Sequence, residues 1–278
     1  MIRNIKAQVN IIIRQSGAKT CFLIMMLLII FNYINNLINL QGIDVGQVPN
    51  FLEISVLSEN NAKGWYILTF LSFFVTLPGA LSLAKEKKTK INIHLVNRCG
   101  GRLKYYVGKI FAVMIVTFLC FLIPFIIELA LNLCAFPIHN TKEFVDVYIE
   151  YSKTTSGFMY DIFQRQPVFY AITRIIYTSV MASLLSLVPL AFSCFYSKYY
   201  ACLILPLYFI LEFYKGSAFK VFGYYPNHNY MGYFWWGLLK NNRKDFIYFT
   251  GMVAVLAVIS IAIIIINAIR GEIENENV

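Results

Sequence analysis

The stretch AKEKKTKINIHLVNRCGGRLKYYVGK, residues 84–109, connects two long apolar segments and decides the fold class of the chain. It carries one acid, Glu86, among the following bases: Lys85, Lys87, Lys88, Lys90, Arg98, Arg102, Lys104 and Lys109. Lysine and arginine concentrate in the cytoplasmic loops of membrane proteins, close to the ends of the spans. The stretch therefore predicts a cytoplasmic loop between two transmembrane helices.

The composition of the 278 residues agrees with a membrane protein. Hydrophobic residues make up 59% of the chain and charged residues only 14%, whereas soluble domains carry about 25% charged residues. The formal net charge of +10 would also suit a nucleic-acid-binding protein. The bases flank apolar segments, however, and do not cover one soluble face. We therefore expect membrane lipid phosphates as their counterions and no nucleic-acid partner.

Apolar segments long enough to cross a bilayer recur along the chain. Crossing the hydrocarbon core takes about 20 residues in a helix. The segments of about this length are 20–40, 65–84, 107–133, 168–193, 199–214 and 246–268. The sequence thus predicts an all-α integral membrane protein with six transmembrane helices, organised as a single domain over residues 1–278.

The distribution of bases beside these segments predicts the orientation. Residues 1–19 contain Arg3, Lys6, Arg14 and Lys19, whereas the 41–64 loop contains only Lys63. Acids and bases nearly balance in the 134–166 segment, which suits an extracytoplasmic loop. We therefore expect a multi-pass protein of the cell membrane with both termini in the cytoplasm.

The first nineteen residues have the pattern of an amphipathic helix. Their apolar side chains recur at spacings of three and four, with polar residues between them: Ile2, Ile5, Val9, Ile12 and Ile13. This pattern predicts an interfacial helix over 1–19 on the inner membrane surface. The alternative is a frayed, positively charged leader to the first span.

The basic loop also contains apolar residues, which a simple charged anchor does not need. Ile91, Ile93, Leu95 and Val96 form an apolar stripe in a segment that should lie outside the bilayer. Such a stripe favours a short helix, over about 86–97, that docks on a cytosolic partner. A positive-inside anchor without a partner remains the alternative.

The same loop resembles that of type-2 ATP-binding-cassette (ABC) exporter permeases. Glu86 matches the acid that follows the second span in that family, and Thr89 matches the next threonine. Cys99-Gly100-Gly101 matches the small-residue turn, and Gly108-Lys109 matches the start of the third span. The resemblance implies that 85–106 is the cytoplasmic coupling loop, with these ATPase-coupling residues: Glu86, Lys88, Thr89, Ile91, Ile93 and Leu95.

Several functional expectations follow from this resemblance. It implies a permease subunit that works with cytosolic ABC ATPase subunits and with a second permease copy or homologue. ATP and Mg would bind the partner ATPase, and this chain would hold no cofactor and have no enzyme activity by itself. Similar short permeases export antimicrobial peptides, drugs or lipid-like compounds. The many Ile, Asn, Lys and Tyr residues suit an AT-rich bacterial genome.

Ionisable residues inside the predicted spans are few, namely Glu128, Arg174 and Glu212. Buried charges in a membrane are costly and mark functional positions. Glu128 and Arg174 lie at similar depths below the outer ends of their spans, so they could form an intramembrane ion pair. The alternative is that each side chain faces water or snorkels to the interface. A multi-span enzyme or a secondary transporter remains the alternative function. The cysteines form no CxxC pair and the histidines are solitary, which predicts no metal site.

The segment 215–245 is apolar but poorly suited to a full crossing. Pro226 removes a helical hydrogen bond, and the run Pro-Asn-His-Asn that begins there would lie at mid-bilayer. Lys220 would lie within the hydrocarbon core, where a lysine costs about 2.5–3.5 kcal/mol at the helix centre. The family resemblance also points to a re-entrant hairpin, on the extracytoplasmic side before the last span. Its exit residues would be Pro226, Asn227, Tyr230 and Trp235.

Overall fold

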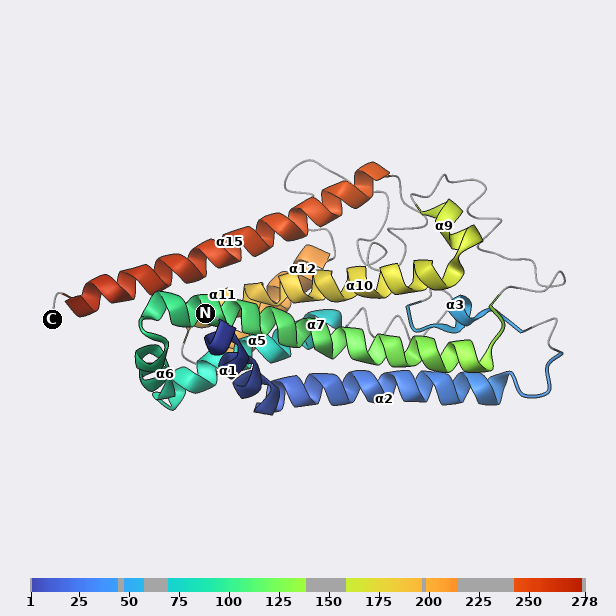
Figure 1. The fold of residues 1–278 in the computed structure, drawn as a ribbon, viewed down its shortest axis with the longest axis horizontal. Coiled ribbons are helices and arrows are strands. Elements are labelled where there is room, and N and C mark those ends of the chain that lie inside the picture. The colour runs from blue at the N-terminus through green and yellow to red at the C-terminus, as the bar shows by residue number, and fades with distance from the viewer. Residues whose placement is uncertain are drawn as a thin grey trace.

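The computed structural model describes residues 2–44, 48–57, 70–138, 159–196, 199–214 and 243–276, and every regular element among them is a helix (Figure 1). This confirms the predicted all-α class. The predicted extracytoplasmic loop 134–166 and re-entrant segment 215–245 lie largely outside the described residues, as do Pro226, Asn227, Tyr230 and Trp235.

Four stretches of the described chain are long and apolar enough to cross a membrane. They are α2 (Ser16–Asn39), α7 (Arg102–Ala135), the consecutive pair α10 (Pro167–Leu185) and α11 (Leu187–Phe195), and Phe249–Arg270 within α15 (Arg243–Glu276). They coincide with four of the six predicted spans. The chain is therefore a helical protein with membrane-spanning character.

Helices also occupy the other two predicted positions, but within the described residues they do not reach the size of a span. The α5 helix (Leu71–Lys88) ends in the charged run Lys85–Lys88, which leaves its apolar part short. The α12 helix (Tyr199–Tyr214) has 16 residues, which is about 24 Å at 1.5 Å per residue, against about 30 Å of hydrocarbon. The described helices thus support four of the six predicted spans, and the other two stay predictions.

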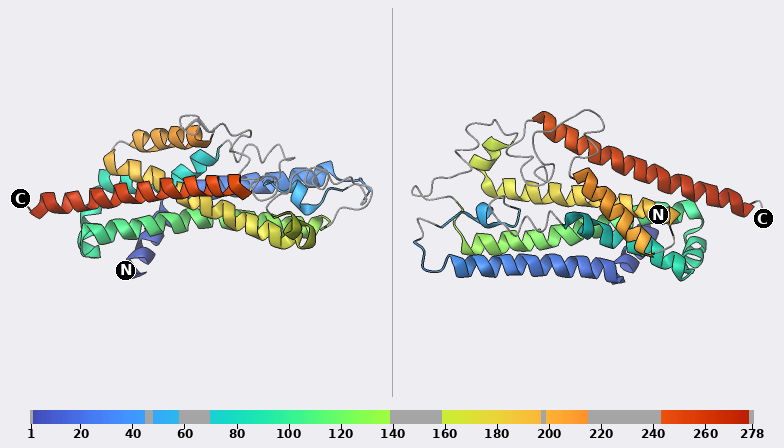
Figure 2. Two further views of the ribbon diagram at one scale, coloured as in Figure 1. Left: turned by 90° about the horizontal axis from the view of Figure 1, so that it is seen from above. Right: turned by 180° about the vertical axis from the view of Figure 1, so that it is seen from behind.

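The α7 helix lies at the centre of the bundle and contacts α2, α10, α15 and α1 (Ile2–Arg14). Figure 1 shows α2 along one side of α7 and α10 along the other. The view from behind shows α5 and α12 on the opposite face (Figure 2). Apolar side chains from most of these helices form one core, in which Val113, Phe121 and Phe125 of α7 are buried.

The two ends of the bundle differ. Helix α6 (Ile91–Cys99), helix α1 and both chain termini lie at one end, whereas α3 (Phe51–Ile54) and α9 (Tyr160–Arg165) lie at the other (Figure 1). We call these the α6 end and the α3 end. The predicted interfacial helix over 1–19 is shorter in the structure, because the backbone is extended at Gln15 and α2 begins at Ser16.

The predicted span 168–193 is interrupted where α10 ends and α11 begins, at Ser186. Pro189 explains the break, because a proline has no N–H to donate and its ring clashes with the carbonyl four residues earlier. Gly79 of α5 packs at this point. A Cβ atom on Gly79 would lie 2.9 Å from the Ser186 carbonyl oxygen and 3.3 Å from Val113. The break and the glycine together allow α5 to approach α11 closely.

Gly79→Ala is expected to lower the free energy of unfolding by about 1–3 kcal/mol, because the added methyl group overpacks a rigid backbone contact. The measurement is the thermal midpoint of the purified protein in detergent. Gly251→Ala is the matched control, since a Cβ there meets nothing within 4 Å. Alanine also favours a helix by about 1 kcal/mol over glycine. Equal midpoints for the two variants would show that α5 does not pack on the break.

Candidate functional site

Helix α6 is a short helix that turns the chain from α5 back into α7. Lys90 precedes it with a φ of 56°, and Gly100 follows it with a φ of 72°. Left-handed backbone at both ends reverses the chain direction, and at the second end the glycine adopts it without a Cβ penalty. The observed helix begins later than the predicted docking helix, because Glu86 and Lys88 still belong to α5.

The apolar residues of α6 differ in their exposure. Leu95, Val96 and Cys99 pack against the main core, although no residue of α6 is fully buried. Ile91 and Ile93, at the start of the helix, are 48% and 56% exposed. Lys88, Lys90 and Arg98 are exposed around them. The outer surface of α6 is therefore apolar at its start and basic at its margins.

Directly behind α6, Glu86 and Lys109 form a buried ion pair. Lys109 Nζ lies 2.5 Å from Glu86 Oε1, with side-chain exposures of 0% and 5%. The Tyr105 hydroxyl donates to the second oxygen of Glu86, and Lys109 also donates to Gln8 Oε1 at 3.4 Å. We call these four residues the Glu86 cluster.

The Glu86 cluster joins three helices at the α6 end. Glu86 comes from the end of α5, Tyr105 and Lys109 from the first turns of α7, and Gln8 from α1. Removing one member of a buried pair costs about 3–5 kcal/mol, because the remaining charge is left without a partner. The cluster therefore fixes the relative position of α5 and α7, the two helices that α6 connects.

Lys87 anchors the end of α5 to a further helix. Its Nζ donates to the carbonyl oxygens of Ser193 and Cys194 at 2.9 and 2.7 Å. These carbonyls belong to the last turn of α11, where a cation compensates the helix dipole and satisfies free acceptors. Burial lowers the pKa of Lys87 below its ordinary value.

Helix α1 is attached to the same end through Asn4. The Asn4 amide donates to the Lys104 carbonyl at 2.9 Å, and the Cys99 thiol donates to Asn4 Oδ1 at 2.8 Å. Gly108 makes room for this side chain, since a Cβ there would lie 3.0 Å from Asn4 Nδ2. One side chain of α1 thus contacts both the end of α6 and the start of α7.

The predicted coupling residues fall into two groups. Lys88, Thr89, Ile91 and Ile93 are exposed at the α6 end. Glu86 is buried in the ion pair, and Leu95 is half-buried against the core. Glu86 therefore lies behind the exposed surface, where it can position α6 but cannot contact a docked protein directly.

At the α3 end, Glu128 holds the segment that follows α3. Its carboxylate accepts hydrogen bonds from the Val56 N–H, from the Ser55 hydroxyl at 3.4 Å and from the Asn32 amide at 3.4 Å. Asn32 also donates to the Ile54 carbonyl at 3.1 Å. One carboxylate of α7 thus ties a buried loop segment to α2.

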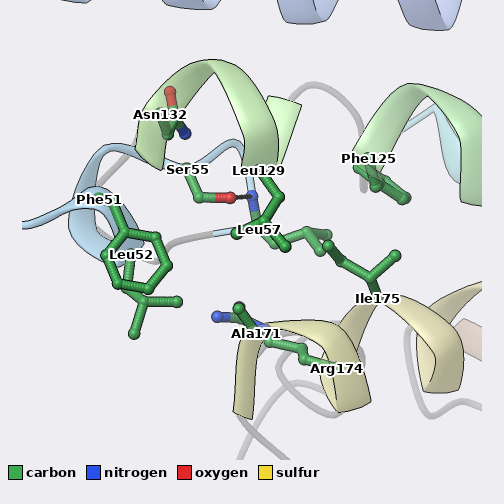
Figure 3. A pocket seen from close by; sticks show the side chains of 10 residues that line it. All are labelled: Phe51, Leu52, Ser55, Leu57, Phe125, Leu129, Asn132, Ala171, Arg174 and Ile175. Atoms are coloured by element: carbon green, nitrogen blue, oxygen red, sulfur yellow. Dashed lines mark hydrogen bonds between the residues drawn. The ribbon is translucent and has the colours of Figure 1, made fainter. Parts of the chain in front are cut away.

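Arg174 does not form the predicted ion pair with Glu128. No carboxylate oxygen of Glu128 lies within 4 Å of its guanidinium, although the two side chains are close enough to interact electrostatically. Arg174 instead lines a small pocket together with Asn132 (Figure 3). The third predicted intramembrane residue, Glu212, belongs to α12, and its side chain lies outside the described part of the structure.

Sequence reasoning missed the residues that bind Glu86. From the sequence, Lys109 is only one of the loop bases and the start of the third span, and no pattern singles out Tyr105 or Gln8. A signal was present, because Glu86 is the only acid in 84–109. An acid that is buried must find a base, and Lys109 is the base of that stretch that lies farthest into the following apolar segment.

In comparisons with known proteins, the chain matches no family model, no curated protein and no solved structure.

Proposed function

We propose that the chain is the membrane-spanning permease subunit of an ATP-driven exporter, of the type-2 ABC class that the 84–109 loop resembles. The observation that carries the proposal is helix α6. It is a short helix between two bundle helices, with Ile91 and Ile93 exposed at its start and no residue fully buried. An exposed apolar pair outside the bilayer is a typical anchor for a docked protein.

The partner in this proposal is a cytosolic ATPase subunit. The α6 end also carries both termini (Figure 1), which agrees with the predicted cytoplasmic orientation of the bases around it. Lys88, Lys90 and Arg98 surround the apolar pair. The complementary site on the ATPase is therefore an apolar groove with acidic margins.

The Glu86 cluster gives this docking helix a rigid connection to the bundle. Force applied to α6 passes into α5 through Glu86 and into α7 through Lys109 and Tyr105. Lys87 extends the connection to α11. ATP-driven closure of two ATPases would thus move α5, α7 and α11 together and change access to the substrate path.

The complete exporter would contain a second permease copy or homologue and two ATPase subunits, which bind ATP and Mg. Six spans, cytoplasmic termini and a re-entrant exit segment over 215–245 belong to this proposal. The substrate would be a peptide, a drug or a lipid-like compound that leaves the cell. Antimicrobial peptides are among the substrate classes that the resemblance implies.

Affinity purification of the tagged chain from membranes of its native host tests the proposal. Photolabelling with 8-azido-ATP, followed by sequencing of the labelled band, identifies any ATP-binding subunit in the complex. We expect a labelled polypeptide distinct from this chain, and MgATP hydrolysis only in fractions that contain it. A pure chain that exports substrate without such a subunit, or that binds the label itself, would contradict the assignment.

A further inference from the structure

A small pocket at the α3 end has a lining that suits a ligand. It lies between α7, α10 and the segment that follows α3, and its volume is about 20 Å³ (Figure 3). By this measure a cavity of about 10–15 Å³ already holds one water molecule. The lining is mostly apolar, with three polar residues from three different elements: Ser55, Asn132 and Arg174.

Two of these polar side chains have buried atoms that form no hydrogen bond with the described residues. Asn132 is 1% exposed, and neither its Nδ2 nor its Oδ1 atom has a partner. Arg174 is 5% exposed, and its Nε–H has none. Leaving a buried donor unsatisfied costs about 1–3 kcal/mol, and more for a charged group. Two such groups lining one cavity indicate that something else binds there.

The charge balance shows which kind of ligand fits. Arg174 carries a buried positive charge, and buried charges in proteins are normally paired. Glu128 compensates it only at a distance, because its carboxylate is occupied by Val56, Ser55 and Asn32. Ser55 is also committed, since its hydroxyl accepts from the Leu57 N–H at 3.2 Å. The open positions of the pocket are thus the Arg174 Nε–H and the Asn132 amide.

We propose that this pocket binds a small monovalent anion of about the size of chloride. The Arg174 Nε–H and the Asn132 Nδ2–H would donate to it, and the apolar lining would exclude larger hydrated ions. The bound anion would join α10 to α7 beside the segment that Glu128 holds. The site is independent of the ATPase-docking surface, which lies at the other end of the bundle (Figure 1).

The test is the thermal midpoint of the purified full-length protein, measured at constant ionic strength in sodium chloride, bromide, formate or gluconate. A ligand that binds only the folded state raises the midpoint in a saturable way. We expect chloride and bromide to raise it by about 4 °C over gluconate. Anomalous scattering from bromide in a crystal would locate the ion. Equal midpoints in chloride and gluconate would mean that water fills the pocket and would overturn the proposal.

Three variants assign the effect to the pocket. Arg174→Gln removes the charge and should abolish the chloride dependence. Asn132→Asp places a carboxylate beside Arg174 and should give a chloride-independent midpoint no lower than that of the wild type in gluconate. Arg165→Gln, at an exposed arginine of α9, is the control and should keep the wild-type dependence. Retention of the full chloride effect in Asn132→Asp would overturn the proposal even if Arg174→Gln failed to fold.

Discussion

Lys109→Met is expected to lower the stability of the protein by about 3–5 kcal/mol, because it leaves the Glu86 carboxylate buried without its counterion. Lys109 is fully buried and Glu86 is 4% exposed, so water cannot replace the lost partner without opening the α6 end. The measurement is the thermal midpoint in detergent, together with the fraction of monodisperse protein after size-exclusion chromatography. The double variant Glu86→Gln/Lys109→Met should recover much of the loss, since it removes both charges.

Lys104→Met is the matched control for this prediction. Lys104 lies on the same helix, but its side chain is exposed, and exposed substitutions typically change stability by less than about 0.5 kcal/mol. A Lys109→Met midpoint equal to that of the control would mean that the ion pair does not hold α5 to α7. A double variant no better than Lys109→Met would mean that Lys109 acts by some contact other than Glu86.

The second large effect concerns docking. Ile91→Asp/Ile93→Asp is expected to weaken the binding of the ATP-labelled subunit by at least about 100-fold. Each fully buried isoleucine contributes about 1.5–3 kcal/mol, and about 2.7 kcal/mol corresponds to a factor of 100 in affinity. The measurement is the amount of 8-azido-ATP-labelled polypeptide recovered per mole of purified chain.

The fold should tolerate this double substitution. Both side chains are exposed, and both lie in the first turn of α6, where a negative charge interacts favourably with the helix dipole. The control is Ile43→Asp, at an isoleucine that is 39% exposed after α2, at the α3 end. If Ile91→Asp/Ile93→Asp recovered as much labelled subunit as the wild type, α6 would not be the docking site.

The positions of the four long spans and of the short helix in the basic loop could be predicted from the sequence. Length and hydropathy determine whether a helix can cross a bilayer, and both are local properties of the chain. The exact ends of the helices could not be predicted in the same way. The helix over 1–19 stops at Arg14, and the span 168–193 breaks at Ser186, because these interruptions depend on Gln15 and Pro189 and on what packs against them.

The partners of the buried charges could not be predicted, since they depend on how neighbouring helices are rotated. Glu128 and Arg174 have similar depths in their spans, as their spacing indicated. Each residue turns a helix by about 100°, however, so equal depth does not make two side chains face each other. In the structure Glu128 contacts the backbone of Val56, and Arg174 lines the pocket. The sequence of 48–57 has no periodicity that would predict its position beside Glu128 and Arg174.

Glu86 illustrates the same point at the α6 end. The sequence assigned it to the basic loop and the family resemblance singled it out, but it lies in the last turns of α5, and neither indicated that it would be buried. Its burial follows from contacts with two other helices: Tyr105 and Lys109 lie one turn apart on α7, and Gln8 comes from α1. The exposed positions Ile91 and Ile93 were predictable because an apolar stripe within a basic loop is visible locally.

A photo-cross-link from α6 shows whether this helix contacts the ATP-binding subunit. The photoreactive amino acid p-benzoylphenylalanine, placed at Ile93 in one variant and at Ile43 in another, reacts only with groups that touch it. We expect irradiation of intact membranes to link position 93, but not position 43, to the polypeptide that 8-azido-ATP labels. A cross-link from position 93 to lipid alone, or equal cross-links from both positions, would contradict the docking role of α6.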